Sequence, residues 1–180
     1  MAGIDPGFAS IGYGVLELGA KDIEALGFGV VRTEKSDKKR GVSAADDNLR
    51  RAQEISRILV PLVDGAQALC FEAPSLPRNA ATSFKLGLCY GIIACLSETA
   101  DVPIVMVTPK GLKKALCGNG SASKEEVAEA VTRRLGRDIT DELLAKKVPR
   151  SQHGHVYDAF GSILANEHDQ TIRALRRIQQ

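Results

Sequence analysis

The stretch Gly3-Ile4-Asp5-Pro6-Gly7 places an acidic residue at the end of a short β-rich run and directly before a Pro-Gly turn. Two further β-rich runs follow at residues 11–18 and 23–33, separated by the turn-forming residues 19–22. Connections this short join antiparallel neighbours in one sheet. The sequence therefore predicts that the chain opens with three antiparallel strands and that Asp5 closes the first of them.

The rest of the chain alternates helix and strand signals. Ser43 is placed to cap a helix to about Val63, and the apolar residues 66–72 predict a buried strand that ends in Glu72. A strand is expected at 103–107, and helices are expected at about 80–99, after Thr108-Pro109, after the capping box at 123–126, at 140–147, and from about 154 into the 170s. This order predicts an α/β protein with a mixed five-stranded sheet and helices on both faces. We expect one domain over residues 1–180, with about 168–180 as a candidate tail.

Composition places few limits on function. The 180 residues are 44% hydrophobic and 26% charged, with a net charge of +2, as in ordinary globular proteins. Residues 108–150 hold 10 Lys or Arg and 6 Asp or Glu. This local excess suits an anionic partner, although a solvated helix face has the same composition.

The cysteines and the N-terminus indicate a cellular compartment. Four cysteines lie in apolar contexts without a CxxC pair, which predicts buried, reduced thiols: Cys70, Cys89, Cys95 and Cys117. The first strand begins too early to leave room for a signal peptide, and no apolar run reaches about 18 residues. We therefore expect a cytoplasmic protein without a membrane span.

Three acids stand where ionised side chains are costly. Asp5 and Glu72 each end a predicted strand, and Asp158 lies in an apolar helix. His155 precedes Asp158 by three residues and therefore shares its helix face. Each acid alone is more typical of a cap or a hydrogen-bonded residue. If the first and fourth strands are neighbours, Asp5 and Glu72 converge at one end of the sheet. Together the acids then predict a cluster of carboxylates that Mg²⁺ or Mn²⁺ would neutralise.

With these residues in place, the sequence resembles the RuvC family of Holliday-junction resolvases, which are nucleases of RNase H-like fold. The matches run in order from residue 3 to about 166, and their collinearity makes the resemblance specific. They comprise residues 3–7, 13–15, 71–72, 79, 85–87, 108–109, 113, 118–120, 124–127 and 158–159.

The resemblance implies a metal-dependent endonuclease that cuts four-way junctions, leaving 5′-phosphate and 3′-hydroxyl ends. Three of the family's four acidic positions fall on Asp5, Glu72 and Asp158, and the fourth falls on His155. It implies two Mg²⁺ ions bound by these four residues, with Mn²⁺ substituting or preferred because an imidazole replaces one carboxylate. The plainer interpretation of His155 is a solvent-facing histidine, and His153 and His168 are expected to be incidental.

The resemblance also implies a DNA-binding set. Lys113 and Lys124 match lysines that the family needs for cleavage or DNA binding, and Lys113 joins the catalytic set. A lysine in a first helical turn, as Lys124 is, opposes the helix dipole and is better explained by a phosphate. Lys110, Arg78, Asn79 and Lys85 are expected to position DNA. The family's stacking aromatic is replaced by Ser75, which puts its sequence selectivity in doubt.

Gly87 and Gly91 would allow close helix–helix contact, either on the protein's own sheet or, as the resemblance implies, in a homodimer. A symmetric dimer suits a junction, which needs two symmetric nicks. Branch-migration motor proteins would be partners in a bacterial host, though not necessarily for a phage-encoded version.

Other functions remain open at this level. A branched-DNA nuclease of phage type, an RNase H-type enzyme and a non-catalytic junction-binding protein share most of these residues. The Asp5 turn also occurs in actin-like ATPases and sugar kinases, but those need a second domain that 180 residues cannot supply. A P-loop is excluded because no glycine precedes Lys124.

Overall fold

A mixed five-stranded sheet forms the centre of the computed structural model, which describes residues 1–180 except 20–21, 38–40, 74–78 and 179–180. The strand order is β3-β2-β1-β4-β5. β1 pairs antiparallel with β2, and β2 with β3, whereas β1–β4 and β4–β5 are parallel. The strands span Ala2–Asp5, Ser10–Leu18, Ile23–Arg32, Leu69–Glu72 and Ile104–Val107.

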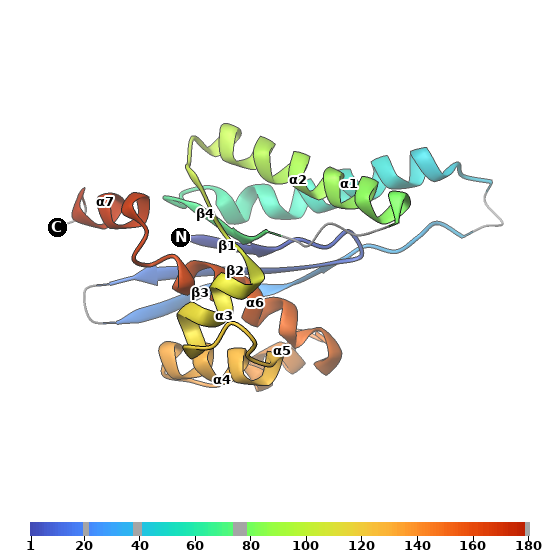
Figure 1. The fold of residues 1–180 in the computed structure, drawn as a ribbon. Helices are drawn as coiled ribbons and strands as arrows, with labels where there is room; N and C mark the ends of the chain where they lie inside the picture. Colours follow the sequence, from blue (N-terminus) through green and yellow to red (C-terminus); the bar gives the residue numbers. More distant parts are fainter. Residues whose placement is uncertain (20–21, 38–40, 74–78, 179–180) are drawn as a thin grey trace.

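Helices cover both faces of this sheet, as the sequence predicted (Figure 1). One face carries α1 (Ala44–Val63) and α2 (Ala80–Ala100) over a core that includes Ile4, Phe71 and Ile93. The other face carries four helices over a second core: α3 (Pro109–Cys117), α4 (Lys124–Leu135), α5 (Thr140–Ala145) and α6 (His153–Ala165). The predicted mixed α/β architecture is confirmed.

The predicted helix starts are also confirmed. The Ser43 hydroxyl accepts from Asp46 N, and the Thr108 hydroxyl accepts from Gly111 N before Pro109 in the first turn. Ser123 and Glu126 form both halves of a capping box at the start of α4. These caps satisfy backbone donors that have no partner within the helix.

The single final helix predicted from about residue 154 into the 170s is wrong. α6 ends at Ala165, and α7 (Gln170–Ile178) is a separate helix. Between them, Asn166 Nδ2 donates to Ser162 O and Asp169 Oδ1 accepts from Thr171 N. Short polar side chains of this kind compete with the helical backbone bonds. α7 is packed on the protein, because Ile172 is fully buried.

One face of α2 is exposed along its length. Cys89, Ile93 and Leu96 are buried, whereas Phe84, Gly87, Gly91 and Cys95 line the opposite, exposed side. The expectation that all four cysteines are buried is therefore wrong for Cys95, which is exposed, and Cys117 is only partly buried. Contrary to the sequence expectation, α2 is also long and apolar enough to satisfy a length-and-composition criterion for a membrane helix, which is weak evidence by itself.

Candidate active site

Asp5 and Glu72 end neighbouring strands at the same edge of the sheet. β1 and β4 are parallel, and Ile4 of β1 is paired with Phe71 of β4. The next residues along the two strands are Asp5 and Glu72, so the pairing places both carboxylates at the carboxyl ends of adjacent strands. This is the convergence that the sequence predicted.

Glycines on β1 and β2 bring α6 to this edge. A Cβ at Gly12 would collide with the carbonyl oxygen of His155, and a Cβ at Gly3 would collide with that of Ala159. α6 therefore lies directly on the sheet, and it carries His155 and Asp158 beside Asp5. In the sequence, the sign of this close approach is the alternation of Gly12 and Gly14 along β2.

His155 and Asp5 are in direct contact. The distance from His155 Nδ1 to Asp5 Oδ2 is 2.6 Å, and both side chains are partly buried. The hydrogen bond to Asp5 raises the pKa of His155, and burial opposes this rise. His155 is thus not the solvent-facing histidine of the plainer interpretation.

The other two carboxyl groups have strongly raised pKa values. Burial raises the pKa of Glu72 to about 7, with further contributions from the negative charges of Asp158 and Asp5. Burial also raises the pKa of Asp158 to about 6, and the charge of Asp5 adds to this. Desolvation and mutual repulsion of this kind are typical of functional carboxylate clusters.

These residues suit divalent cations as donors but do not form a closed ligand set. Among the residues that the structure describes, no three His, Cys, Asp or Glu side chains are arranged to hold a metal ion. A cation would offset the mutual repulsion that, after burial, contributes to the raised carboxyl pKa values, and carboxylate oxygens are ligands that Mg²⁺ and Mn²⁺ prefer. Binding would require these side chains to move closer together around the ion.

Two lysines act on the same carboxylates. The positive charges of Lys113 and Lys124 lower the pKa values of Glu72 and Asp158, in part offsetting burial. Lys113 lies on α3, and Lys124 is the first residue of α4, as predicted. The stem of Lys110 lies over Gly120 in the connection between these helices.

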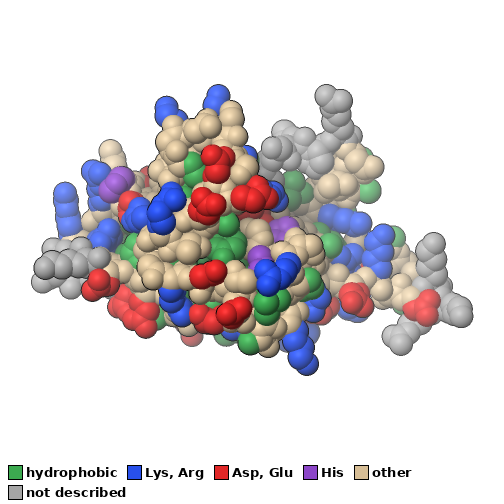
Figure 2. Space-filling model, turned by 90° about the horizontal axis from the view of Figure 1, so that it is seen from below, with side chains coloured by type: hydrophobic (Ala, Val, Ile, Leu, Met, Phe, Trp, Pro, Cys, Tyr) green, Lys and Arg blue, Asp and Glu red, His purple; other side chains and the backbone are tan. Residues whose placement is uncertain are grey.

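The basic excess of residues 108–150 does not form one patch. Figure 2 shows the face seen from the side of α4 and α5, where Lys and Arg side chains are interspersed with Asp and Glu. On this face, an anion would therefore be attracted by individual Lys and Arg side chains and not by one continuous basic surface.

The remaining predicted DNA-binding residues divide into three cases. Lys85 lines a cleft of about 450 Å³ together with His155, Leu86 and residues 6–10. Asn79 caps α2, since its side-chain oxygen accepts from Ala81 N and Thr82 N. Arg78 lies outside the described residues, as does Ser75, which replaces the stacking aromatic that the resemblance implies.

The two other histidines are apart from this set. His153 is buried, and its Nε2 lies 3.0 Å from Val148 O. His168 is exposed on the surface beside Glu167. Among the described residues, neither histidine forms a hydrogen bond or an ion pair with Asp5, Glu72, His155 or Asp158.

Comparison with known proteins identifies the family. The family model described as crossover junction endodeoxyribonuclease RuvC matches residues 1–145. The RuvC endonuclease of Chlorobium phaeobacteroides is 33% identical over 78% of this chain and 75% of its own length. That of Porphyromonas gingivalis is 32% identical over 74% of this chain and 67% of its own length.

The match to solved structures continues past the end of the family model, into the part of the chain that carries His155 and Asp158. The family model ends before His155 and Asp158. Thermus thermophilus RuvC, solved in complex with a Holliday junction substrate, matches 97% of this chain and 95% of its own, with a TM-score of 0.74 and 27% identity. The fold, the acidic edge of its sheet and these relatives agree, and the chain belongs to the RuvC family of crossover junction endodeoxyribonucleases.

Proposed function

We propose that this protein resolves four-way (Holliday) junctions by paired symmetric nicks, through metal-dependent hydrolysis of DNA phosphodiesters that leaves 5′-phosphate and 3′-hydroxyl ends. The observation that carries the proposal is the convergence of Asp5, Glu72, His155 and Asp158 at one sheet edge beside Lys113 and Lys124. The Holliday junction substrate in the Thermus thermophilus complex supports the choice of DNA.

The four clustered side chains would hold the metal, with two Mg²⁺ ions or Mn²⁺ in their place. Bound there, the ions would supply a nucleophilic water and would neutralise charge on the scissile phosphate. The protein's own contribution is to hold the donors together in a partly buried site. Lys113 supports the phosphate as developing negative charge accumulates on its oxygens.

DNA outside the scissile phosphate is held by dispersed contacts. We assign this role to Lys124, Lys110 and Lys85, and to Arg78 and Asn79, which precede α2 in the sequence. Asn79 can bind DNA only through its amide nitrogen, because its side-chain oxygen caps α2. Because these contacts are mainly to phosphates, junction affinity should fall steeply with salt.

The exposed face of α2 is assigned to a second copy of this chain. A Cβ at Gly87 or Gly91 would meet no atom within 4 Å. The glycines are therefore not needed for packing within the chain, which argues against contact with its own sheet. The exposed Phe84 and Cys95 extend the same face. A dimer would place two active sites in symmetric positions, as paired nicking requires.

A cleavage assay tests the proposal. A synthetic four-way junction, a fork and a linear duplex would be compared with Mg²⁺, Mn²⁺ or EDTA. Asp5→Asn serves as the inactive variant, and Asp141→Asn, in the first turn of α5, as a matched control. We expect paired nicks in the junction alone, abolished by EDTA and by Asp5→Asn but not by Asp141→Asn.

Other results would change the assignment. Equal cutting of forks or duplex would indicate a broader branched-DNA nuclease. Tight junction binding without cutting would indicate a binding protein.

A further inference from the structure

The turn that follows Asp5 is held by hydrogen bonds to its backbone carbonyl groups. Residues 6–9 connect β1 to β2, and with Lys85 and His155 they line the cleft beside the candidate active site. Phe8 of this turn is buried, and its carbonyl oxygen accepts a 2.7 Å hydrogen bond from the Thr33 hydroxyl. The next carbonyl, that of Ala9, accepts from Thr33 N. The position of the turn therefore depends on residue 33, just after β3.

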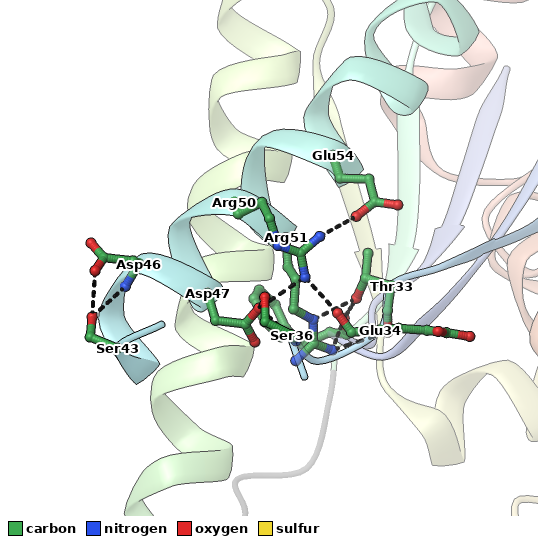
Figure 3. A network of polar contacts seen from close by, with 10 residues as sticks. Thr33, Glu34, Ser36, Ser43, Asp46, Asp47, Arg50, Arg51 and Glu54 are labelled. Atoms are coloured by element: carbon green, nitrogen blue, oxygen red, sulfur yellow. Dashed lines mark hydrogen bonds and ion pairs between the residues drawn. The ribbon is translucent and has the colours of Figure 1, made fainter. Parts of the chain in front are cut away.

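Arg51 of α1 joins both parts of this contact. Its Nε donates to the Thr33 hydroxyl at 2.9 Å, and its Nη2 donates to Phe8 O at 3.2 Å and to Thr33 O at 3.4 Å. The guanidinium carbon also lies 4.5 Å from the centre of the Phe8 ring. The Arg51 side chain thus contacts both the backbone and the ring of Phe8. It also contacts Thr33, which binds the Phe8 carbonyl; Figure 3 shows Arg51 beside Thr33.

Arg51 is an unexpected residue for this position. Its exposed fraction is only 3%, and the hydrogen bonds described for it go to uncharged oxygens. A buried cation without an ionised partner is costly, and an apolar side chain would fill the same space at less cost. The geometry supplies a reason, because the planar guanidinium can bind several fixed oxygens at once.

The neighbouring Arg50 provides a contrast. Its side chain is 47% exposed and forms ion pairs with Asp47 and Glu54. It also donates to Glu34 O, on the segment leading away from the turn (Figure 3). Arg50 is therefore an arginine of the same helix without a contact to Phe8 in the structure.

We propose that Arg51 is a positioning residue for the active site: through Thr33 and Phe8 it fixes the turn of residues 6–9, and thereby the carboxylate of Asp5 and one wall of the cleft. Asp5 lies three residues before Phe8, so a shift of the turn moves Asp5 relative to Glu72 on the adjacent strand. The proposal concerns cleavage geometry and rests on the proposed nuclease function.

The test compares Arg51→Met, Arg51→Lys and Thr33→Val with Arg50→Met as the matched control. Thr33→Val has nearly the same shape but removes the hydroxyl that accepts from Arg51 and donates to the Phe8 carbonyl, and it leaves Arg51 in place. Two quantities are measured: the single-turnover cleavage rate at saturating junction, and hydrogen–deuterium exchange over residues 6–12 in metal-free protein. Junction affinity in Ca²⁺ is measured in parallel.

We expect Arg51→Met to lower the cleavage rate at least about tenfold, since small misplacements of catalytic groups have effects of this order. It should speed exchange of residues 6–12, with junction affinity little changed. Thr33→Val should act in the same direction, Arg51→Lys should recover part of the rate, and Arg50→Met should match the wild type in both measurements.

Wild-type cleavage and exchange in Arg51→Met or in Thr33→Val would overturn the proposal. Full recovery in Arg51→Lys, or exchange that increases uniformly along the chain, would do so as well, because charge or global stability would then explain the effect. If Arg51→Met does not fold, Thr33→Val decides. If the wild type cuts no branched DNA, the nuclease function fails while the exchange data still show whether Arg51 fixes the turn.

Discussion

His155 Nδ1 lies 2.6 Å from Asp5 Oδ2, so a histidine on α6 and an acid on β1 form one hydrogen-bonded pair at the candidate active site. The contact uses one ring nitrogen and leaves Nε2 for a metal ion or a water molecule. An imidazole is a softer ligand than a carboxylate and suits Mn²⁺ better than Mg²⁺. The pair therefore bears directly on which ion supports cleavage.

We expect His155→Asp to increase several-fold the ratio of the cleavage rate in Mg²⁺ to that in Mn²⁺. The physical reason is that a fourth carboxylate restores a hard oxygen donor. Rates would be measured on a four-way junction at equal concentrations of the two ions. If the wild type is equally active with both ions, histidine does not set the preference.

Stability should depend on pH through Glu72 and Asp158. Their pKa values are raised to about 7 and about 6, so the folded state binds protons more tightly than the unfolded state does. The resulting stabilisation is fully present below the ordinary carboxyl pKa values and is lost as the pH rises through about 6 to 7. From the contribution of these two groups, the metal-free protein should have a lower melting temperature at pH 8 than at pH 5. Thermal unfolding at the two pH values measures the difference.

Mg²⁺ should reverse this dependence. Because the ion binds the ionised carboxylates, the increase in melting temperature on adding Mg²⁺ should be small at pH 5 and large at pH 8. Thermal unfolding with Mg²⁺ and with EDTA across this interval measures the difference. An increment that does not vary with pH would show that these carboxylates do not bind the ion.

Asp158→Asn should stabilise the metal-free protein while abolishing cleavage. It removes a desolvated negative charge, and we expect a gain of roughly 1–2 kcal/mol in unfolding free energy at pH 8. For a chain of this size, that corresponds to an increase of several degrees in melting temperature. Glu129→Gln, at an exposed site on α4, is the control and should change neither quantity. A less stable Asp158→Asn protein would contradict the assigned origin of the raised pKa.

The sequence predicted the elements that local chemistry determines. Ser43, Thr108 and Ser123 each satisfy backbone donors within three residues, so their helices begin where expected. The placement of Asp5 beside Glu72 was predicted on the condition that the first and fourth strands are neighbours, and β1 and β4 are paired. The break between α6 and α7 was missed because the apolar pattern continues past it, while Asn166 and Asp169 bond to the local backbone instead.

Long-range contacts were not predictable in the same way. The contact of Arg51 with Phe8 joins residues 43 positions apart. The four-residue spacing of Arg51, Ile55 and Leu59 places Arg51 on the buried face of α1, but it does not identify Phe8 as the partner. The His155–Asp5 pair spans 150 positions and depends on how closely α6 approaches the sheet. That approach is set by glycines, whose function is seen only once the facing helix is known.

Gly12→Ala tests this close approach. The added methyl group would collide with the His155 carbonyl, so α6 must move away from β2. We expect a loss of roughly 1–3 kcal/mol in unfolding free energy, as for other overpacked cores, together with loss of cleavage. Gly27→Ala on β3 is the matched control, because a Cβ there meets no atom within 4 Å. Full activity in Gly12→Ala would show that the position of α6 does not limit catalysis.

Gly91 distinguishes a free helix face from a dimer interface by the sign of the effect. In an isolated chain, replacing a glycine inside a helix by alanine should stabilise by roughly 0.5–1 kcal/mol, and leucine should also be accepted because no atom lies near. If α2 packs closely on a second copy, Gly91→Leu must instead separate the helices and shift the protein towards monomer. Light scattering after size exclusion measures the mass, and Cys95, exposed on the same face, allows crosslinking with a short bismaleimide. A monomeric wild type, with Gly91→Leu more stable than it, would remove the dimer from the proposed function and leave paired nicking without a structural basis.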